Sequence, residues 1–222
     1  MTVHLNFAEG KERARENVVC PIYVINLPHR TDRLEKIKKI FKDFNIIVVE
    51  AVKHDDPVIG CFLSHKKCIQ IAKEKNLKYI TVIEDDCIPF DGIEIFKEKY
   101  FNIKKYLETV DNWYVFLGGT IETKRRHIIN KINDVDINLY NISIGYCAHF
   151  IIYNHKTYEH YLNHKMDKPL DHVWNEIAPA LISLPFIASQ DDTYSDITKS
   201  NYSYNKRIRE TNDRLIKYVK KL

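Results

Sequence analysis

Three adjacent carboxylates, Glu84-Asp85-Asp86, directly follow the apolar segment KYITVI, which spans residues 78–83. Three negative charges at the mouth of a buried strand repel one another strongly in a low-dielectric environment. They stay ionised together only if water, backbone N–H groups or a cation offsets the repulsion. Mg²⁺ or Mn²⁺ binds typically through one or two carboxylates and substrate phosphates. The triplet is therefore either a divalent-metal site or a solvated acidic turn, and both interpretations stay open here.

A second polar group follows an earlier apolar run, in the turn NLPHRTDR from Asn26 to Arg33. The guanidinium groups of Arg30 and Arg33 can pair with phosphate or stack on a base. The alternative is ordinary helix chemistry, because Asp32 is placed to cap the helix that follows and a surface arginine beside it needs no ligand. Either way, we expect this turn to lie at the end of a strand.

The segment GCFLSHKKC contains the adjacent pair Ser64-His65. The segment is predicted to be helical, and neighbouring residues of a helix do not face each other. We therefore exclude a hydrolase-type pair and expect a buried, hydrogen-bonded His65.

The elements that must position these residues alternate between strand and helix. Continuous apolar runs predict buried strands, and apolar residues at helical spacing predict helices. Strands are expected over 18–27, 46–52, 78–83, 113–117, 147–153 and 184–188, and helices over 34–44, 60–75, 96–107, 156–163, 170–180 and 207–222. Residues 120–141 are polar and are predicted to form a loop. This alternation predicts an α/β fold with parallel strands, in which a ligand site lies at the carboxyl ends of the strands.

Composition narrows the class of protein further. The 222 residues fit one α/β domain, and 34 Lys+Arg against 30 Asp+Glu give a mild charge of +4 that does not call for a nucleic-acid partner. The six glycines form no phosphate-binding loop, and the five cysteines form no C-x-x-C pair, so neither a disulfide framework nor a structural zinc site is indicated. The sequence contains no signal region or membrane-length apolar run. We expect a cytoplasmic, reducing compartment, which is that of a host cell if the protein is viral.

Seven segments, taken in order, resemble glycosyltransferase family 25, which includes bacterial lipooligosaccharide galactosyltransferases, animal procollagen galactosyltransferases and related giant-virus enzymes. Together they span about residues 20 to 200. The segments are VINLPHRTDRL (24–34), GCFLSH (60–65), ITVIEDDCIPF (80–90), WYVFLGG (113–119), IGYCAHFIIYNHKTYEHYL (144–162), PLDHVW (169–174) and PFIASQDDTYSDI (185–197).

This resemblance implies a GT-A type nucleotide-binding sheet with flanking helices in a single domain, and a UDP-hexose donor with Mn²⁺ or Mg²⁺. By analogy with the family's D-x-D-like motif, Asp86 and Glu84 would bind the metal. Glu84 and Asp85 would also lie near the ribose or a metal-bound water, and Asn26, Arg30 and Arg33 would face the nucleotide. We expect a leader over 1–17, the GT-A domain over 18–204 and a basic C-terminal helix over 205–222, which can touch an anionic membrane surface.

The resemblance also implies an inverting transfer to a hydroxyl group, for which Asp171 of PLDHVW is the candidate general base. Its alternative role is an N-cap. The chain has His-Val-Trp where the procollagen enzymes have Glu-Phe-Leu, which leaves the acceptor open between a collagen-like chain bearing hydroxylysine or galactosylhydroxylysine and a glycan. The donated hexose is galactose or glucose. Asp191, Asp192 and Asp196 are either further metal or acceptor contacts or turn residues.

Two other classes of function compete with this one. A catalytically silent sugar-nucleotide or glycan-binding module would keep the same fold. A metal-dependent phosphohydrolase or nuclease would also use carboxylate clusters, but the sequence shows no second carboxylate and histidine constellation of that kind.

Overall fold

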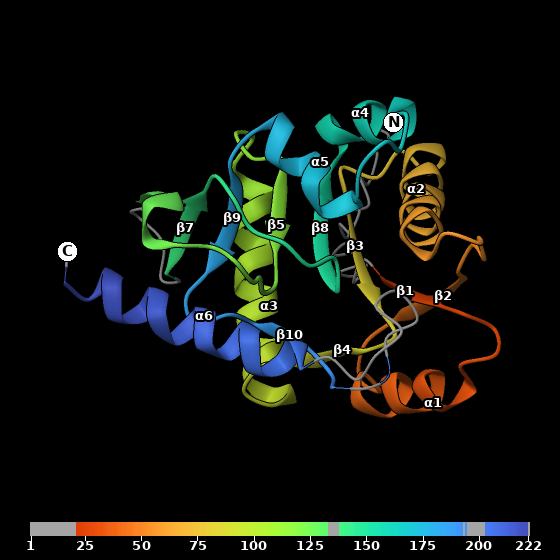
Figure 1. Cartoon of the computed structure of the whole chain (residues 1–222), viewed down its shortest axis with the longest axis horizontal. Helices are drawn as coiled ribbons and strands as arrows, with labels where there is room; N and C mark the ends of the chain where they lie inside the picture. Colours follow the sequence, from red (N-terminus) through yellow and green to blue (C-terminus); the bar gives the residue numbers. More distant parts are fainter. Residues whose placement is uncertain (1–20, 133–137, 193, 195–202, 222) are drawn as a thin grey trace, which may run out of the picture.

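The computed structural model describes residues 21–132, 138–192, 194 and 203–221. Its centre is a mixed eight-stranded sheet in the order β2-β1-β3-β8-β5-β9-β7-β6 (Figure 1). The strands of this sheet are β1 (Ile22–Asn26), β2 (Ile46–Glu50), β3 (Tyr79–Glu84), β5 (Val115–Leu117), β6 (Ile128–Ile132), β7 (Leu139–Ile142), β8 (Phe150–Asn154) and β9 (Ala180–Ser183). A smaller antiparallel sheet pairs β10 (Ala188–Gln190) with β4 (Cys87–Pro89).

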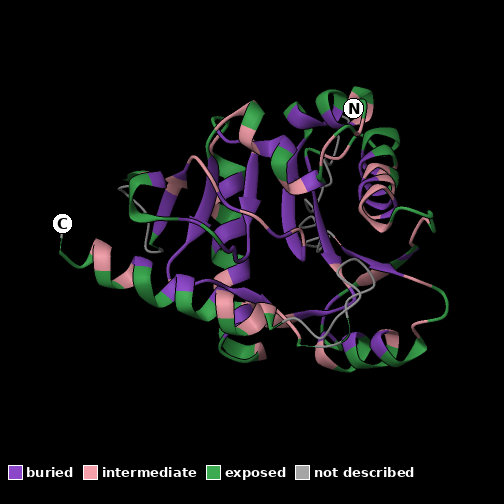
Figure 2. Ribbon diagram, in the orientation of Figure 1, coloured by how far each residue is buried: buried purple, intermediate pink, exposed green. Residues whose placement is uncertain are grey.

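The first three strands of the sheet run parallel, with β1 between β2 and β3. Every residue of β1 is buried, and Figure 2 shows the central strands buried along their length. A strand covered on both faces needs apolar residues at successive positions, which explains why the segment around β1 reads as one apolar run. This confirms the α/β sheet with flanking helices that the sequence predicts.

Helices cover both faces of the sheet, and side chains alternate between them along each strand. Tyr23 and Ile25 of β1 join the core beneath α2 (Pro57–Glu74), α4 (Tyr158–Asn163) and α5 (Leu170–Ile177). Ile22 and Val24 join the core beneath α1 (Thr31–Ile40) and α3 (Ile93–Thr109). Helix α6 (Tyr204–Val219) buries Ile208 and Leu215 in the first core. Two short 3₁₀ helices, η1 (Arg125–His127) and η2 (His155–Thr157), complete the elements. Among the described helices, none combines the length and apolarity that a membrane crossing needs.

Three sequence predictions are wrong in this part of the chain. The strand predicted over 184–188, except for its last residue, falls in the gap between β9, which ends at Ser183, and β10, which starts at Ala188. Residues 120–141, predicted as a loop, contain η1 and the antiparallel pair β6 and β7. β6 lies at the sheet edge, where exposed Asn and Lys side chains interrupt its apolar pattern. The helix predicted over 170–180 ends at Ile177, because β9 starts at Ala180. The leader over 1–17 lies outside the described residues, and the domain limits stay a prediction.

Two glycines after β5 bring the large and small sheets together. The carbonyl of Gly118 accepts hydrogen bonds from the backbone N–H groups of Ile187 (2.9 Å) and Ala188 (3.0 Å). A Cβ atom on Gly119 would lie 2.3 Å from the carbonyl oxygen of Ala188, which is closer than real Cβ contacts. The backbone before β10 therefore packs directly on this turn, where a side chain at position 119 has no room.

Candidate functional site

A cavity of about 290 Å³ lies where the parallel strands end. Its walls come from the ends of β1 and β3, the segment after β2, the start of α2 and β10. The charged and polar residues that line it are His29, Arg33, Lys53, His54, Asp55, Cys61, Ser64, Glu84, Asp85, Asp86 and Gln190. Ligands of α/β sheets bind at this end of the strands. The cavity therefore lies where the sequence places the acidic triplet and the turn after the first strand.

The three carboxylates of the triplet have different partners. Glu84 closes β3 and accepts a hydrogen bond from Sγ of Cys61 at 3.3 Å. Asp85 accepts from Nδ2 of Asn26 at 2.7 Å, and Asp86 accepts from Nε2 of Gln190 at 3.1 Å. The triplet thus divides between a Glu84 side toward α2 and an aspartate side toward α1.

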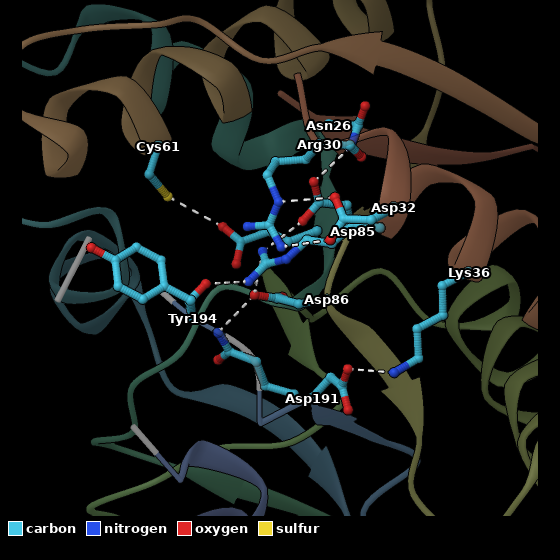
Figure 3. A network of polar contacts seen from close by, with 12 residues as sticks. Asn26, Arg30, Asp32, Lys36, Cys61, Asp85, Asp86, Asp191 and Tyr194 are labelled. Carbon is cyan, nitrogen blue, oxygen red and sulfur yellow. Dashed lines mark hydrogen bonds and ion pairs between the residues drawn. The ribbon is translucent and has the colours of Figure 1, made fainter. Parts of the chain in front are cut away.

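Arg33 joins the two aspartates. Its Nη1 donates to Oδ1 of Asp85 at 2.9 Å and to Oδ2 of Asp86 at 3.0 Å, and its Nη2 donates to the carbonyl of Tyr194 at 2.8 Å (Figure 3). The arginine side chain is only 10% exposed. A positive charge therefore already offsets the repulsion between the aspartates, and that charge comes from the protein.

One buried oxygen of the triplet is without a partner among the described residues. Oδ1 of Asp86 is buried and makes no hydrogen bond. Burial, followed by the negative charge of Glu84, raises the pKa of Asp86 to about 7, although Arg33 opposes the rise. Burial also raises the pKa of Asp85. A buried carboxylate oxygen of this kind is costly alone and accepts a cation readily.

In the turn after β1, Asn26 contacts the acidic triplet, whereas Arg30 pairs with a residue outside the triplet. Asn26 donates from Nδ2 to the carbonyl of Arg30 at 3.1 Å as well as to Asp85, and so holds the turn closed. Arg30 pairs with Asp32 at 3.0 Å, and the side chain of Asp32 is 66% exposed. The capping role expected for Asp32 is wrong, because α1 begins at Thr31 with Arg30 at its N-cap position and without a side-chain cap.

Asp171 lies in the first turn of α5, beyond the residues that line the cavity. Its Oδ2 accepts a hydrogen bond from the backbone N–H of Cys147 at 3.2 Å. Cys147 has a φ of 97°, a conformation that favours glycine, so the backbone is strained where it meets this carboxylate. Burial raises the pKa of Asp171, and the charge of Glu84 adds to the rise. The N-cap role is wrong, since Pro169 holds that position.

The late acidic residues have structural partners. Asp191 pairs with Lys36, and its backbone N–H donates to the carbonyl of Asp86 at 2.8 Å. Asp192 accepts from Asn205 N–H at 2.9 Å at the start of α6. Asp196 lies outside the described residues.

Sequence reasoning missed two groups at the site. Gln190 reaches Asp86 from β10, and no pattern in the neighbouring sequence predicts this contact. Cys61 and His65 lie one helical turn apart on α2, and this spacing is a signal in the sequence that the two side chains share a face. The buried, hydrogen-bonded state expected of His65 is confirmed, because its Nδ1 lies 2.9 Å from the hydroxyl of Tyr153.

Comparisons with known proteins give one family. The model of glycosyltransferase family 25 (LPS biosynthesis protein) matches residues 55–156. No curated protein matches the chain. Among solved structures, the chain is similar to A197 from STIV, with 11% identity, a TM-score of 0.42, and coverage of 77% of this chain and 85% of that chain. It is also similar to apo UDP-glucose pyrophosphorylase, with 11% identity, a TM-score of 0.41, and coverage of 91% and 82%.

The matched residues contain α2, β3 and the acidic triplet, whereas Asp171 and the turn after β1 lie outside them. The resemblance that the sequence predicts is confirmed by this match. Over these residues the chain is similar to glycosyltransferase family 25, and this similarity supports glycosyltransferase activity.

Proposed function

We propose that this chain is an inverting, metal-dependent glycosyltransferase that moves a hexose from a UDP-sugar to a hydroxyl group. The observation that carries the metal-dependent part is the buried Oδ1 of Asp86, which has no partner among the described residues and belongs to a carboxylate lining the cavity.

The oxygen donors at this corner fit Mn²⁺ or Mg²⁺. Asp86 and Glu84 are the proposed ligands, with Asp85 on the ribose side, and carboxylate oxygens are what these hard ions prefer. Arg33 uses Oδ2 of Asp86, so Oδ1 can bind an ion without loss of the arginine contact. The bound ion would offset negative charge on the departing diphosphate.

The cavity suits a nucleotide diphosphate in charge and size. Its volume of about 290 Å³ is close to that of small-molecule sites. Two cations, Arg33 and Lys53, line it together with four carboxylates, so the bound ion would supply the further positive charge that a diphosphate needs. Asn26 and Arg33 fix Asp85 by hydrogen bonds, which orients its carboxylate toward the donor. Arg30, in the same turn, is proposed as a second guanidinium for the nucleotide.

Asp171 is the proposed general base. The acceptor hydroxyl has a pKa far above neutrality, so a carboxylate must take its proton as the new bond forms. A raised pKa makes Asp171 a stronger proton acceptor, and its hydrogen bond to Cys147 fixes its position. One displacement at the anomeric carbon would invert the sugar.

The choice of galactose or glucose, and of a hydroxylysine, galactosylhydroxylysine or glycan acceptor, rests on the family resemblance. A few hydrogen bonds to one sugar hydroxyl decide between such donors.

The proposal is tested by measuring UDP release from UDP-galactose and from UDP-glucose. Each donor is assayed with Mn²⁺ or with EDTA, and with or without an acceptor, which is a collagen-like peptide or a simple sugar. We expect Mn²⁺-dependent release that an acceptor stimulates, with a product of inverted anomeric configuration. Tight UDP-sugar binding without release under every condition would instead identify a catalytically silent binding module. Release that no acceptor stimulates would favour hydrolysis.

A further inference from the structure

Cys61, His65 and Glu84 form a compact group of three different ligand types. Cys61 and His65 lie on one face of α2, and Glu84 meets them from the end of β3. One ligand atom from each residue lies within 4.8 Å of the other two. Sγ of Cys61, which points from α2 into the network of Figure 3, is 3.3 Å from Oε1 of Glu84. Nε2 of His65 is 3.5 Å from the same oxygen.

Nε2 of His65 is fully buried and makes no hydrogen bond among the described residues. The opposite ring nitrogen, Nδ1, contacts the hydroxyl of Tyr153 at 2.9 Å. When Nδ1 carries the proton and donates it to Tyr153, Nε2 presents its lone pair toward Cys61 and Glu84. Metal-binding histidines usually have this arrangement, in which the second nitrogen donates to a neighbouring group and fixes the tautomer.

The separations match a tetrahedral site. Zinc bonds to sulfur, nitrogen and oxygen at roughly 2.0–2.3 Å, so neighbouring ligand atoms of a tetrahedron lie about 3.3–3.7 Å apart. Both distances to Oε1 of Glu84 fall in this range, and Sγ of Cys61 and Nε2 of His65 lie within 4.8 Å of each other.

The ligand types select a thiophilic ion. Thiolate and imidazole suit Zn²⁺ and Co²⁺, whereas Mg²⁺ and Mn²⁺ prefer oxygen alone. Cys61 and Glu84 also line the cavity, so a fourth position can face solvent or a ligand, as in zinc sites with three protein ligands.

We propose that Cys61, His65 and Glu84 bind a Zn²⁺-class ion at a site separate from the oxygen-ligand ion of the donor. Binding releases the thiol proton of Cys61 to solvent and forms a metal–sulfur bond. Because Glu84 is shared, occupancy withdraws this carboxylate from the donor ion and slows transfer. That second consequence, unlike the binding itself, rests on the proposed function.

Titration of the full-length, metal-free chain with Co²⁺ tests the binding. We expect one Co²⁺ per chain, a thiolate-to-cobalt charge-transfer band and the visible bands of tetrahedral cobalt, all of which Zn²⁺ removes and Mn²⁺ does not. Cys61→Ser removes the charge-transfer band, while the matched variant Cys68→Ala, on the same helix and outside the group, keeps it. Tyr153→Phe weakens Co²⁺ binding about tenfold, the usual effect of losing a group that orients a ligand.

Circular dichroism shows that each variant is folded before it is compared. A wild-type chain without the charge-transfer band, or a band that survives Cys61→Ser, would overturn the site.

A separate assay addresses the effect on transfer. With saturating Mn²⁺, we expect Zn²⁺ to lower UDP release about tenfold in the wild type and far less in Cys61→Ser, each relative to its own rate without Zn²⁺. Equal inhibition of both proteins would disprove the link to Glu84. Cobalt binding without any transfer would refute the proposed function and leave the metal site standing, and transfer without cobalt binding would do the reverse.

Discussion

The negative charges on the two sides of the acidic triplet are stabilised by different groups. On the aspartate side, a cation of the protein, Arg33, bridges Asp85 and Asp86. On the other side, Glu84 meets Cys61 and His65. Although burial opposes the change, the contacts with His65 and Cys61 lower the pKa of Glu84, whereas burial raises the pKa of both aspartates.

This difference shows that neighbours in sequence need not form one ligand cluster. β3 ends at Glu84, and Asp85 and Asp86 lie in the turn that follows, so the two aspartates reach Arg33 of α1 while Glu84 faces Cys61 of α2. On the aspartate side, Arg33 offsets part of the negative charge and one buried oxygen has no partner among the residues that the structure describes, whereas the Glu84 side offers softer ligands. Four predictions test this division.

The largest effect is expected from Asp86→Asn, which keeps the shape of the side chain and removes its negative charge. We expect transfer to fall about a thousandfold, comparable to the loss of a group that stabilises transition-state charge. Rates of UDP release at saturating Mn²⁺, together with circular dichroism, check this. Asp191→Asn is the matched control, because Asp191 pairs with Lys36 and should leave the rate within about twofold. Full activity of Asp86→Asn would remove the metal assignment.

Arg33→Gln breaks the aspartate side by leaving two buried carboxylates without their shared cation. We expect a loss of about 3 kcal/mol in the free energy of unfolding, as for other broken buried ion pairs. Added Mn²⁺ should restore part of it. Urea unfolding with EDTA and with Mn²⁺ measures both effects. Arg30→Gln, in the same turn, should cost less than about 1 kcal/mol because its partner Asp32 is exposed. Equal losses in the two variants would contradict the bridging role.

Asp171→Asn tests the proposed general base, whose pKa is raised in part by the charge of Glu84. We expect a loss of about a hundredfold in kcat, in the range for a general base. In the wild type, activity should rise with pH through the raised pKa of Asp171, because only the deprotonated carboxylate accepts the proton. The variant should lose this acid limb, which is the rise in activity with pH at the acidic end of the profile.

Glu84→Gln should move the limb to lower pH, since the charge of Glu84 raises the pKa of Asp171. A limb unchanged in both variants would show that another group titrates.

Gln190→Met is expected to have the smallest effect, because it removes one neutral donor to Asp86 and keeps Arg33. The affinity for Mn²⁺ should change by about fivefold or less, equivalent to about 1 kcal/mol. Isothermal titration calorimetry measures this change. A loss as large as that of Arg33→Gln would show that the amide, and not the arginine, organises the aspartate side.

Local sequence predicted the elements whose pattern the sheet requires. β1, β3 and α2 were found because strands buried on both faces need unbroken apolar runs and long helices need a repeating apolar face. The placement of Glu84, Asp85 and Asp86 at a strand end followed directly. β6 and β7 were missed because an edge hairpin can be half polar.

The contacts between residues within the site could not be predicted from the sequence, for a different reason. Arg33 meets Asp85 across 52 positions and Gln190 meets Asp86 across 104, so no local pattern relates them. The choice between a solvated turn and a charge-balanced cluster depends on these tertiary contacts. For Asp32, the local pattern itself misled: it predicts a helix cap, but the side chain forms an ion pair with Arg30 instead.

The tight approach of Gly119 to Ala188 has a consequence for how the acidic triplet and its partners can be altered. Gln190 lies two positions beyond Ala188 on β10, so any side chain that pushes this strand away would also draw the amide off Asp86. Substitutions at Gly118 or Gly119, which do not line the cavity, should therefore alter ligand affinity through the backbone. Random mutagenesis aimed at the acidic triplet should therefore include this remote turn.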